Sequence, residues 1–263
     1  MAPALVHSLH LQVVVTGGEV HLGHSQWSLG VWVVDTATAA WRLAATLEAG
    51  RRHHAAVLHC CSVYLVGGYG RHRQPLDTVE VVELGSGRVS PGPSLPWPVR
   101  RPAAAMWGGR LVMVAEVEDG VHVVALRPGS GAWERLHCRG QARLQGGALP
   151  PGVDRCLAAP GGRGLYLTST YSTKVHRLTL PSPSTYTVEL VGAFTCEAGN
   201  TCMLGSRLYN FYSEEFGDER VVEVLDTDTG VFSVELRREL PHWELSPAPQ
   251  YSYGCFPLLS YDL

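Results

Sequence analysis

The stretch from Arg51 to Leu84 most constrains what this chain can fold into, because it holds three short apolar segments separated by turns. The segments cover about 55–59, 62–66 and 78–84, and none carries apolar residues at the 3.6-residue spacing of a helix. They therefore predict three antiparallel strands. The doublet Gly67-Gly68 ends the second segment, where the chain needs torsions or close approaches that a Cβ atom would prevent.

A sheet this small cannot bury both of its faces alone, and the sequence repeats it. The strand with its glycine doublet occurs first at 12–18, and copies without the doublet cover 110–116, 164–170 and 207–213. A second signature is an apolar residue seven positions before a large one, at 34–41, 126–133 and 225–232, with a weakened copy at 82–89. A period of about 50 residues with four short strands in each unit predicts a β-propeller.

The motifs resemble those of kelch-repeat propellers over nearly the whole chain. The resemblance rests on the run Tyr-Leu-Val-Gly-Gly at 64–68 after the basic Arg51-Arg52-His53, and on the aspartate-containing turn that leads to Trp41. Two units carry the double glycine and three have lost it. The pattern is most similar to the propellers of BTB–kelch (kelch-like) ubiquitin-ligase adaptors, although these 263 residues contain no BTB or BACK-like helical segment.

The resemblance and the spacing together predict an all-β kelch β-propeller that occupies residues 1–263 as a single domain. We expect five four-stranded antiparallel blades and a ring closed by a C-terminal strand, which would remove an exposed sheet edge. A sixth blade would require strands hidden in 137–164, and the Gly, Pro and Arg content of that segment argues against them. The expected blades are 9–47 together with 253–259, then 51–95, 101–137, 153–191 and 194–237.

Composition limits the setting and the kinds of partner. Hydrophobic residues make up 45% of the chain and charged residues 17%, as in a well-buried sheet protein. The net charge of −3 argues against non-specific nucleic-acid binding, and no apolar run approaches the roughly 20 residues of a membrane span. Seven cysteines and no signal-peptide pattern predict a cytoplasmic protein with free thiols.

Catalytic chemistry is not indicated by the sequence, and we expect no enzyme activity, cofactor or metal. The paired histidines and Cys60-Cys61 lack metal-ligand spacing, because neighbours on a strand point to opposite faces. Copper radical oxidases share this type of propeller and are a remote alternative. Their site needs tyrosines and histidines together, but Tyr166, Tyr171, Tyr209 and Tyr212 lie in the fourth and fifth blades, whereas the histidines cluster in the first and second. We interpret Trp41 and Trp133 as blade-core residues.

The remaining candidate is the loop face, which we define as the surface formed by the loops between strands two and three of each blade and the loops between blades. Arginine is well suited to binding carboxylates, and in the resembled adaptors the arginine that opens a blade often contacts substrate peptide. We expect Arg51 and Arg101, at or beside that position, to be at least partly exposed. The candidate partner-binding residues are Arg51, Arg52, His53, Arg71, Arg73, Arg100, Arg101, Tyr171, Glu214, Glu215 and Trp243.

These observations predict a non-enzymatic protein–protein interaction module. Its most concrete form is substrate recognition for a cullin-RING ubiquitin ligase, with the ligase contact made by a BTB region absent from this sequence. An actin- or cytoskeleton-associated scaffold propeller is the alternative, since kelch repeats occur there too. The choice between them rests on analogy, because one fold serves many functions.

Overall fold

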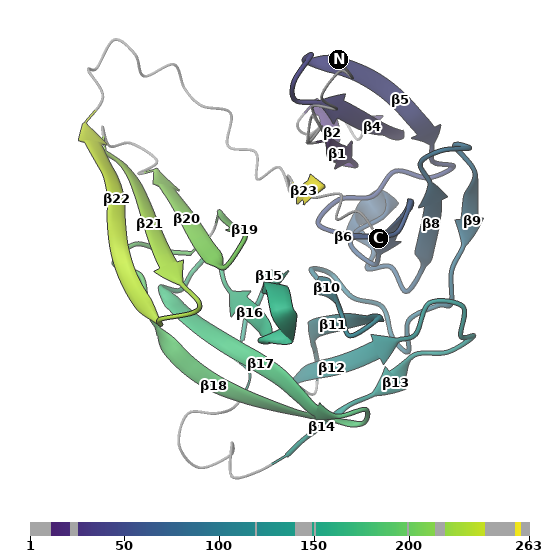
Figure 1. Cartoon of the computed structure of the whole chain (residues 1–263). Helices are drawn as coiled ribbons and strands as arrows, with labels where there is room; N and C mark the ends of the chain where they lie inside the picture. The colour runs from purple at the N-terminus through teal and green to yellow at the C-terminus, as the bar shows by residue number, and fades with distance from the viewer. Residues whose placement is uncertain are drawn as a thin grey trace, which may run out of the picture.

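The protein is an all-β propeller, as the computed structural model in Figure 1 shows. The structure describes residues 12–21, 26–118, 120–139, 149, 151–198, 200–213, 219–239 and 256–258. These residues form five large sheets arranged round a centre and one short hairpin. The only described helical segments are two single 3-10 turns, η1 (Arg71–Arg73) and η2 (Pro160–Gly162). The predicted fold class and five four-stranded blades are therefore confirmed.

The strands predicted at 55–59, 62–66 and 78–84 are present within one residue of those bounds in the second blade. Blade 1 contains β1 (Gln12–Thr16), β4 (Gly30–Asp35), β5 (Ala40–Thr46) and β23 (Phe256–Leu258). Its loop carries the hairpin β2 (Glu19–His21) and β3 (Gln26–Trp27). Blade 2 contains β6 (Ala55–His59), β7 (Ser62–Val66), β8 (Val79–Glu83) and β9 (Val89–Pro91).

The later blades repeat the order, each starting with its innermost strand. Blade 3 contains β10 (Ala103–Trp107), β11 (Arg110–Val117), β12 (Gly120–Leu126) and β13 (Glu134–Arg135). Blade 4 contains β15 (Arg155–Ala158), β16 (Leu165–Thr168), β17 (Lys174–Ser182) and β18 (Thr185–Ala193). Blade 5 contains β19 (Thr201–Leu204), β20 (Arg207–Ser213), β21 (Glu219–Asp226) and β22 (Val231–Glu239).

One short strand was not expected from the sequence. β14 (His137–Cys138) runs parallel to β18 and adds a fifth strand to the outer edge of blade 4. Residue 137 was expected at the end of blade 3. The physical gain is that β14 covers the outer edge of β18, whose backbone groups would otherwise be unpaired at that end.

The ring is closed as predicted, by a strand from the C-terminal part of the chain. β23 pairs antiparallel with β1, with Pro257 opposite Val13. The resulting order β23-β1-β4-β5 matches β6-β7-β8-β9 in blade 2, so β23 occupies the first-strand position of blade 1. The inner edge of β1 is therefore paired rather than left open to another chain.

The hydrophobic core lies between blades rather than within them. Four buried clusters join blade 1 to blade 2, blade 2 to blade 3, blade 3 to blade 4 and blade 4 to blade 5. Leu65, Met113, Leu167 and Leu208 each belong to one of the four and are fully buried. Among the described residues, no such cluster joins blade 5 to blade 1.

The glycine doublets allow the close chain approaches that the sequence predicts. Gly68 has φ +90°, and a Cβ atom there would lie 2.5 Å from the carbonyl oxygen of Arg52. Gly17 has φ +74°, and a Cβ atom there would lie 2.5 Å from the carbonyl oxygen of Arg51. Both doublets therefore let the segment that opens blade 2 pass close to the ends of β1 and β7, the strands that the doublets follow.

The second repeated signature is a turn stabilised by an aspartate. Oδ1 of Asp35 accepts hydrogen bonds from the backbone N–H groups of Ala37 and Thr38, at 2.9 and 3.0 Å. Asp226 repeats this arrangement with the N–H groups of Asp228 and Thr229, both at 2.9 Å. Side-chain acceptance of this kind fixes the turn locally in these two copies of the signature.

The aromatic residues that end this signature have different environments. Trp133 packs against the cluster between blades 2 and 3 and donates a hydrogen bond from Nε1 to the Pro93 carbonyl at 2.9 Å. The ring of Phe232 lies 5.2 Å from that of Phe194. Trp41, in contrast, is 61% exposed, so its predicted core position is wrong. The rings of Trp133 and Phe232 are partly buried, and each packs against the preceding blade. Among the described residues, no cluster joins blade 1 to blade 5 in the same way.

Candidate functional site

Arg51 is a buried structural residue, so the expectation that its side chain is at least partly exposed is wrong. Only 3% of Arg51 is exposed. Nη1 donates to the carbonyl oxygens of Leu65, Gly67 and Thr78, each at 3.3 Å, and Nη2 donates to Oγ1 of Thr78 at 3.2 Å. These contacts fasten the segment between blades 1 and 2 to two strands of blade 2.

An ion pair with Glu80 compensates for the burial of this charge. Nη2 of Arg51 lies 2.7 Å from Oε2 of Glu80, whose side chain is 17% exposed. Burial lowers the pKa of Arg51, and the Glu80 carboxylate opposes that shift. An arginine held in this way is committed to the fold and is not free to bind a partner.

Arg52 points to the other side of the strand and is half-buried between two aromatic rings. Its guanidinium carbon lies 5.2 Å from the Trp27 ring centroid and 5.7 Å from that of Tyr69. Backbone hydrogen bonds join Arg52 and Tyr69 in both directions, at 3.0 and 2.8 Å. Cation–π contacts therefore hold this guanidinium in place beside the inner opening of blade 2.

His53 marks the point where arginines from three blades come together. The side chain is exposed, and its ring meets Tyr69 edge-on at 5.9 Å. Burial of part of the ring lowers the pKa of His53, and the charges of Arg101, Arg52 and Arg155 lower it further against the opposing charge of Asp154. We call Arg52, His53, Arg101 and Arg155 the inner basic cluster.

The members of the inner basic cluster lie beside innermost strands. Arg52 and His53 precede β6, Arg101 precedes β10, and Arg155 begins β15, in three consecutive blades (Figure 1). Arg101 is exposed and Arg155 is partly buried. The structure thus places three predicted residues, Arg52, His53 and Arg101, beside the innermost strands of blades 2 and 3.

Arg155 was missed in the sequence analysis. Its Nη1 donates to the backbone carbonyl of Asp154 at 3.2 Å, and Oδ2 of Asp154 accepts from the backbone N–H of Thr170 at 3.2 Å. The signal that could have identified Arg155 is its place at the start of the first strand of blade 4. Basic residues also occur just before the first strands of blades 2 and 3, which begin at Ala55 and Ala103.

The other predicted residues that the structure describes are exposed on loops. Arg71 and Arg73 are exposed on η1, in the loop between the second and third strands of blade 2. Arg100 is exposed beside Val99, and Tyr171 is 77% exposed in the corresponding loop of blade 4. Glu214, Glu215 and Trp243 lie outside the described residues, so the acidic part of the predicted face is not placed.

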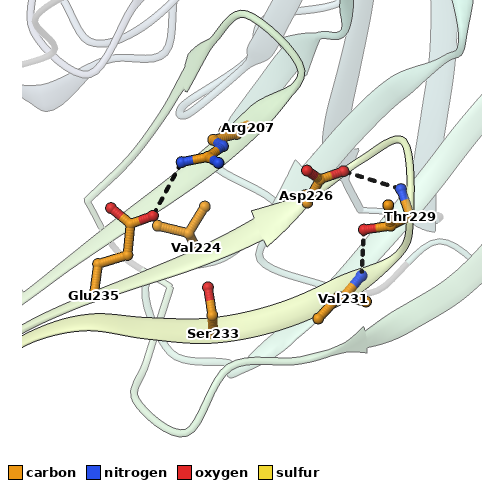
Figure 2. A pocket seen from close by; sticks show the side chains of 7 residues that line it. All are labelled: Arg207, Val224, Asp226, Thr229, Val231, Ser233 and Glu235. Atoms are coloured by element: carbon orange, nitrogen blue, oxygen red, sulfur yellow. Dashed lines mark hydrogen bonds and ion pairs between the residues drawn. The ribbon is translucent and has the colours of Figure 1, made fainter.

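Blade 5 has a shallow hollow of about 290 Å³ on one sheet face, shown in Figure 2. Its charged groups already have partners: Nη1 of Arg207 lies 3.1 Å from Oε1 of Glu235, and Asp226 accepts from the Thr229 N–H. Hydrogen bonds of the Asp226 turn lower the pKa of that carboxyl group. The hollow therefore offers no unpaired charge to a ligand among its lining residues.

Blades 4 and 5 share a buried carboxylate that is also structural. Glu223 is 3% exposed and accepts hydrogen bonds from the N–H and hydroxyl of Thr195 (both 2.7 Å), the N–H of Cys196 (3.1 Å) and Nδ2 of Asn210 (3.3 Å). These donors fasten the loop between the two blades. In the described part of the chain, no group of three or more His, Cys, Asp or Glu residues is placed to hold a metal ion.

Comparison with known proteins adds one family match. The family described as the Kelch motif matches residues 50–96, which run from just before Arg51 through the end of blade 2. The chain is a five-bladed propeller that carries a kelch motif. The motif and the ring together support a kelch-repeat propeller. No curated protein matches the chain significantly, and no described helix is long and apolar enough to cross a membrane.

Proposed function

We propose that this propeller is a non-enzymatic protein-interaction domain that binds an acidic segment of a partner protein. The inner basic cluster is the observation that carries the proposal. The charges of Arg101, Arg52 and Arg155, which lie at the starts of three consecutive blades, lower the pKa of His53, and among the described residues the charge of Asp154 opposes them. A positive site beside the innermost strands is suited to carboxylates, because guanidinium groups bind them in a bidentate manner.

The geometry favours binding at low entropic cost. Arg52 is held between Trp27 and Tyr69, so its guanidinium loses little freedom when a ligand arrives. Arg101 is exposed and can reach a partner directly. Charge-assisted hydrogen bonds of this kind contribute about 1.5–3 kcal/mol each, and a few such residues usually dominate the energy of an interface.

The more specific form of the proposal is substrate recognition for a cullin-RING ubiquitin ligase in the cytoplasm. Its support is the resemblance of the repeats to those of BTB–kelch adaptors, and the ligase contact would be made by a BTB region outside these residues. The cytoskeletal alternative uses the same fold and remains an outcome of the test. The net charge of −3 favours a protein partner over nucleic acid.

Affinity purification of the complete gene product tests both levels of the proposal. The double variant Arg101→Glu/Arg155→Glu should bind the recovered partner at least about 100-fold more weakly, since two charge-assisted contacts become repulsive. The control Arg88→Glu/Arg127→Glu makes the same change in net charge at exposed turns and should bind normally. Equal binding by both double variants would overturn the cluster as the binding site.

The identity of the recovered proteins separates the two classes of partner. Recovery of a cullin with a substrate supports the ligase function. Co-sedimentation with actin filaments and no cullin would instead establish the scaffold function and overturn the ligase function.

A further inference from the structure

A second concave site lies on the loop face, between blades 1 and 2 and outside the inner basic cluster. It is a pocket of about 420 Å³ formed by the loop after β5, the loop after β7 and the outer strands of blade 2. Its walls include the apolar side chains of Ala49, Leu76, Val79 and Pro91. The volume falls in the lower part of the usual range for ligand pockets, about 300–1,000 Å³.

The buried ion pair of Arg51 and Glu80 lines the same pocket. The two charges compensate each other, so this part of the lining is close to neutral. Nε of Arg51 is buried and has no hydrogen-bond partner among the described residues. The pocket thus combines apolar walls with a compensated charge pair that belongs to the fold.

The rim on the blade 2 side is basic and has a fixed shape. Arg71 lines the pocket, and Arg73 lies in the same turn; no hydrogen bond or ion pair engages either side chain within the described part of the chain. The turn is closed by a hydrogen bond of 2.9 Å from the Gly70 N–H to the Gln74 carbonyl. His72 and Arg73 have φ of 56° and 59°, a left-handed conformation that is uncommon for residues other than glycine.

The opposite rim carries the opposite charge. Glu48 is exposed on the loop from blade 1 and also lines the pocket. A bound segment therefore meets positive charge on the blade 2 side and negative charge on the blade 1 side. This asymmetry fixes which way a charged segment can lie across the pocket.

We propose that this pocket is an anchor site for a partner peptide in which one apolar side chain is flanked by carboxylates. The apolar side chain enters between Ala49, Leu76 and Pro91, and the carboxylates lie against Arg71 and Arg73. The inference rests on the proposed function and extends it, because it assigns a second contact that sets the sequence preference of the partner. A basic residue at the other end of the segment would lie against Glu48.

Fluorescence polarisation with labelled nine-residue peptides tests this anchor. The probes have a glutamate and glycine background with a central Leu, Phe or Ala, and a matched set replaces every glutamate with lysine. The Leu or Phe peptide should bind at least about 10-fold more tightly than the Ala peptide, because only the larger side chains bury apolar surface in the pocket. The lysine peptides should not bind.

Two variants test whether the peptide binds at this pocket. Ala49→Trp fills the pocket from an exposed loop position, and Arg71→Glu reverses the rim charge; each should weaken the Leu peptide at least about 10-fold. Ala132→Trp and Arg88→Glu are the matched controls at exposed turns and should leave binding unchanged. Thermal melts of all four confirm that the fold is retained.

The outcomes distinguish this inference from the proposed function. If binding is lost in Arg101→Glu/Arg155→Glu but kept in Ala49→Trp and Arg71→Glu, the anchor is overturned and the inner basic cluster retains its role. Equal binding of Leu, Phe and Ala peptides, or no binding of any acidic peptide, also overturns the anchor. Partner capture that depends on Arg101 and Arg155 would still support the proposed function in each of these cases.

Discussion

The guanidinium of Arg51 lies 2.7 Å from the carboxylate of Glu80, and this buried pair ties the segment between blades 1 and 2 to the third strand of blade 2. The adjacent Arg52 lies between two aromatic rings on the other side of the same segment. Two neighbouring arginines thus have separate roles, one in stability and one in the inner basic cluster. The difference follows from the alternation of side chains along an extended chain.

The buried pair makes a prediction about stability. Arg51→Ala should destabilise the protein by about 3–5 kcal/mol, because the Glu80 charge loses its partner in a buried site. Arg71→Ala should change the free energy of unfolding by less than about 0.5 kcal/mol, since that side chain is exposed and unpaired among the described residues. Urea unfolding of both variants measures the difference, and similar midpoints would contradict the structural role of Arg51.

The glycine doublet of blade 2 gives a second prediction. Gly68→Ala should destabilise the protein by more than about 3 kcal/mol, because strain from the positive φ adds to a collision with the Arg52 carbonyl oxygen. Gly108→Ala is the matched control: its φ is also positive, at +57°, but nothing lies within 4 Å of a Cβ atom there. The control should cost only about 1–3 kcal/mol of strain. Equal melting temperatures for the two variants would show that the close approach is not important.

The fold was predictable because its signals are local. Alternating apolar residues and glycine doublets place strands within about one residue, as the predicted 62–66 and the observed β7 show. The closing strand was also predictable, since blade 1 lacks an opening strand and one occurs near the C-terminal end. These features need only short-range patterns and the requirement that sheet edges be paired.

The site was less predictable because it depends on which side of a strand each residue faces. The sequence alone cannot tell which of Arg51 and Arg52 is buried. Arg51 is paired with Glu80 on β8, and two other strands, β6 and β7, separate the two residues in the chain. Trp41 shares its repeat position with Trp133, yet only Trp133 packs against a preceding blade. Arg155 lacks a neighbouring basic residue, so the pattern that identified the other arginines does not include it.

Stability should depend on pH through His54. Burial, with the charges of Arg51 and His53 as smaller causes, lowers the pKa of His54 to about 3. The unfolded chain binds this proton near its ordinary pKa of about 6.5, so the contribution of His54 to stability is complete above that pH. As the pH falls from about 6.5 toward 3, each unit should cost about 1.4 kcal/mol.

His54→Leu tests this dependence. The variant loses no hydrogen bond at Nδ1, which is buried and has no partner among the described residues. Its urea midpoint should fall less between pH 7 and pH 5 than that of the unmodified protein. A residual slope is expected because burial also lowers the pKa values of His53 and His176. If the urea midpoint changes equally with pH in both proteins, His54 is not buried in the neutral form.

The thiols should divide into reactive and unreactive groups. Cys60, Cys61 and Cys138 are exposed, whereas Cys156 is buried and burial raises its pKa to about 12. Brief alkylation of the native protein followed by peptide mapping should label the three exposed residues and leave Cys156 unmodified, because the thiolate is the reacting form. Labelling of Cys156 at a rate similar to that of Cys138 would contradict this packing between blades 3 and 4.

The last prediction concerns ring closure. Deleting residues 253–263 removes β23 and leaves the inner edge of β1 without a partner. Deleting only 259–263 retains β23 and is the matched control. The longer deletion should aggregate and lower the melting temperature by at least about 4 °C, because each kcal/mol shifts that temperature by about 2–4 °C in a protein of 150–250 residues, and an exposed edge strand pairs readily with other chains. Light scattering and thermal melts of the two deletions measure these effects. A longer deletion that remains monomeric and melts like the control would show that β23 contributes little to closure and that contacts among the other strands hold the ring.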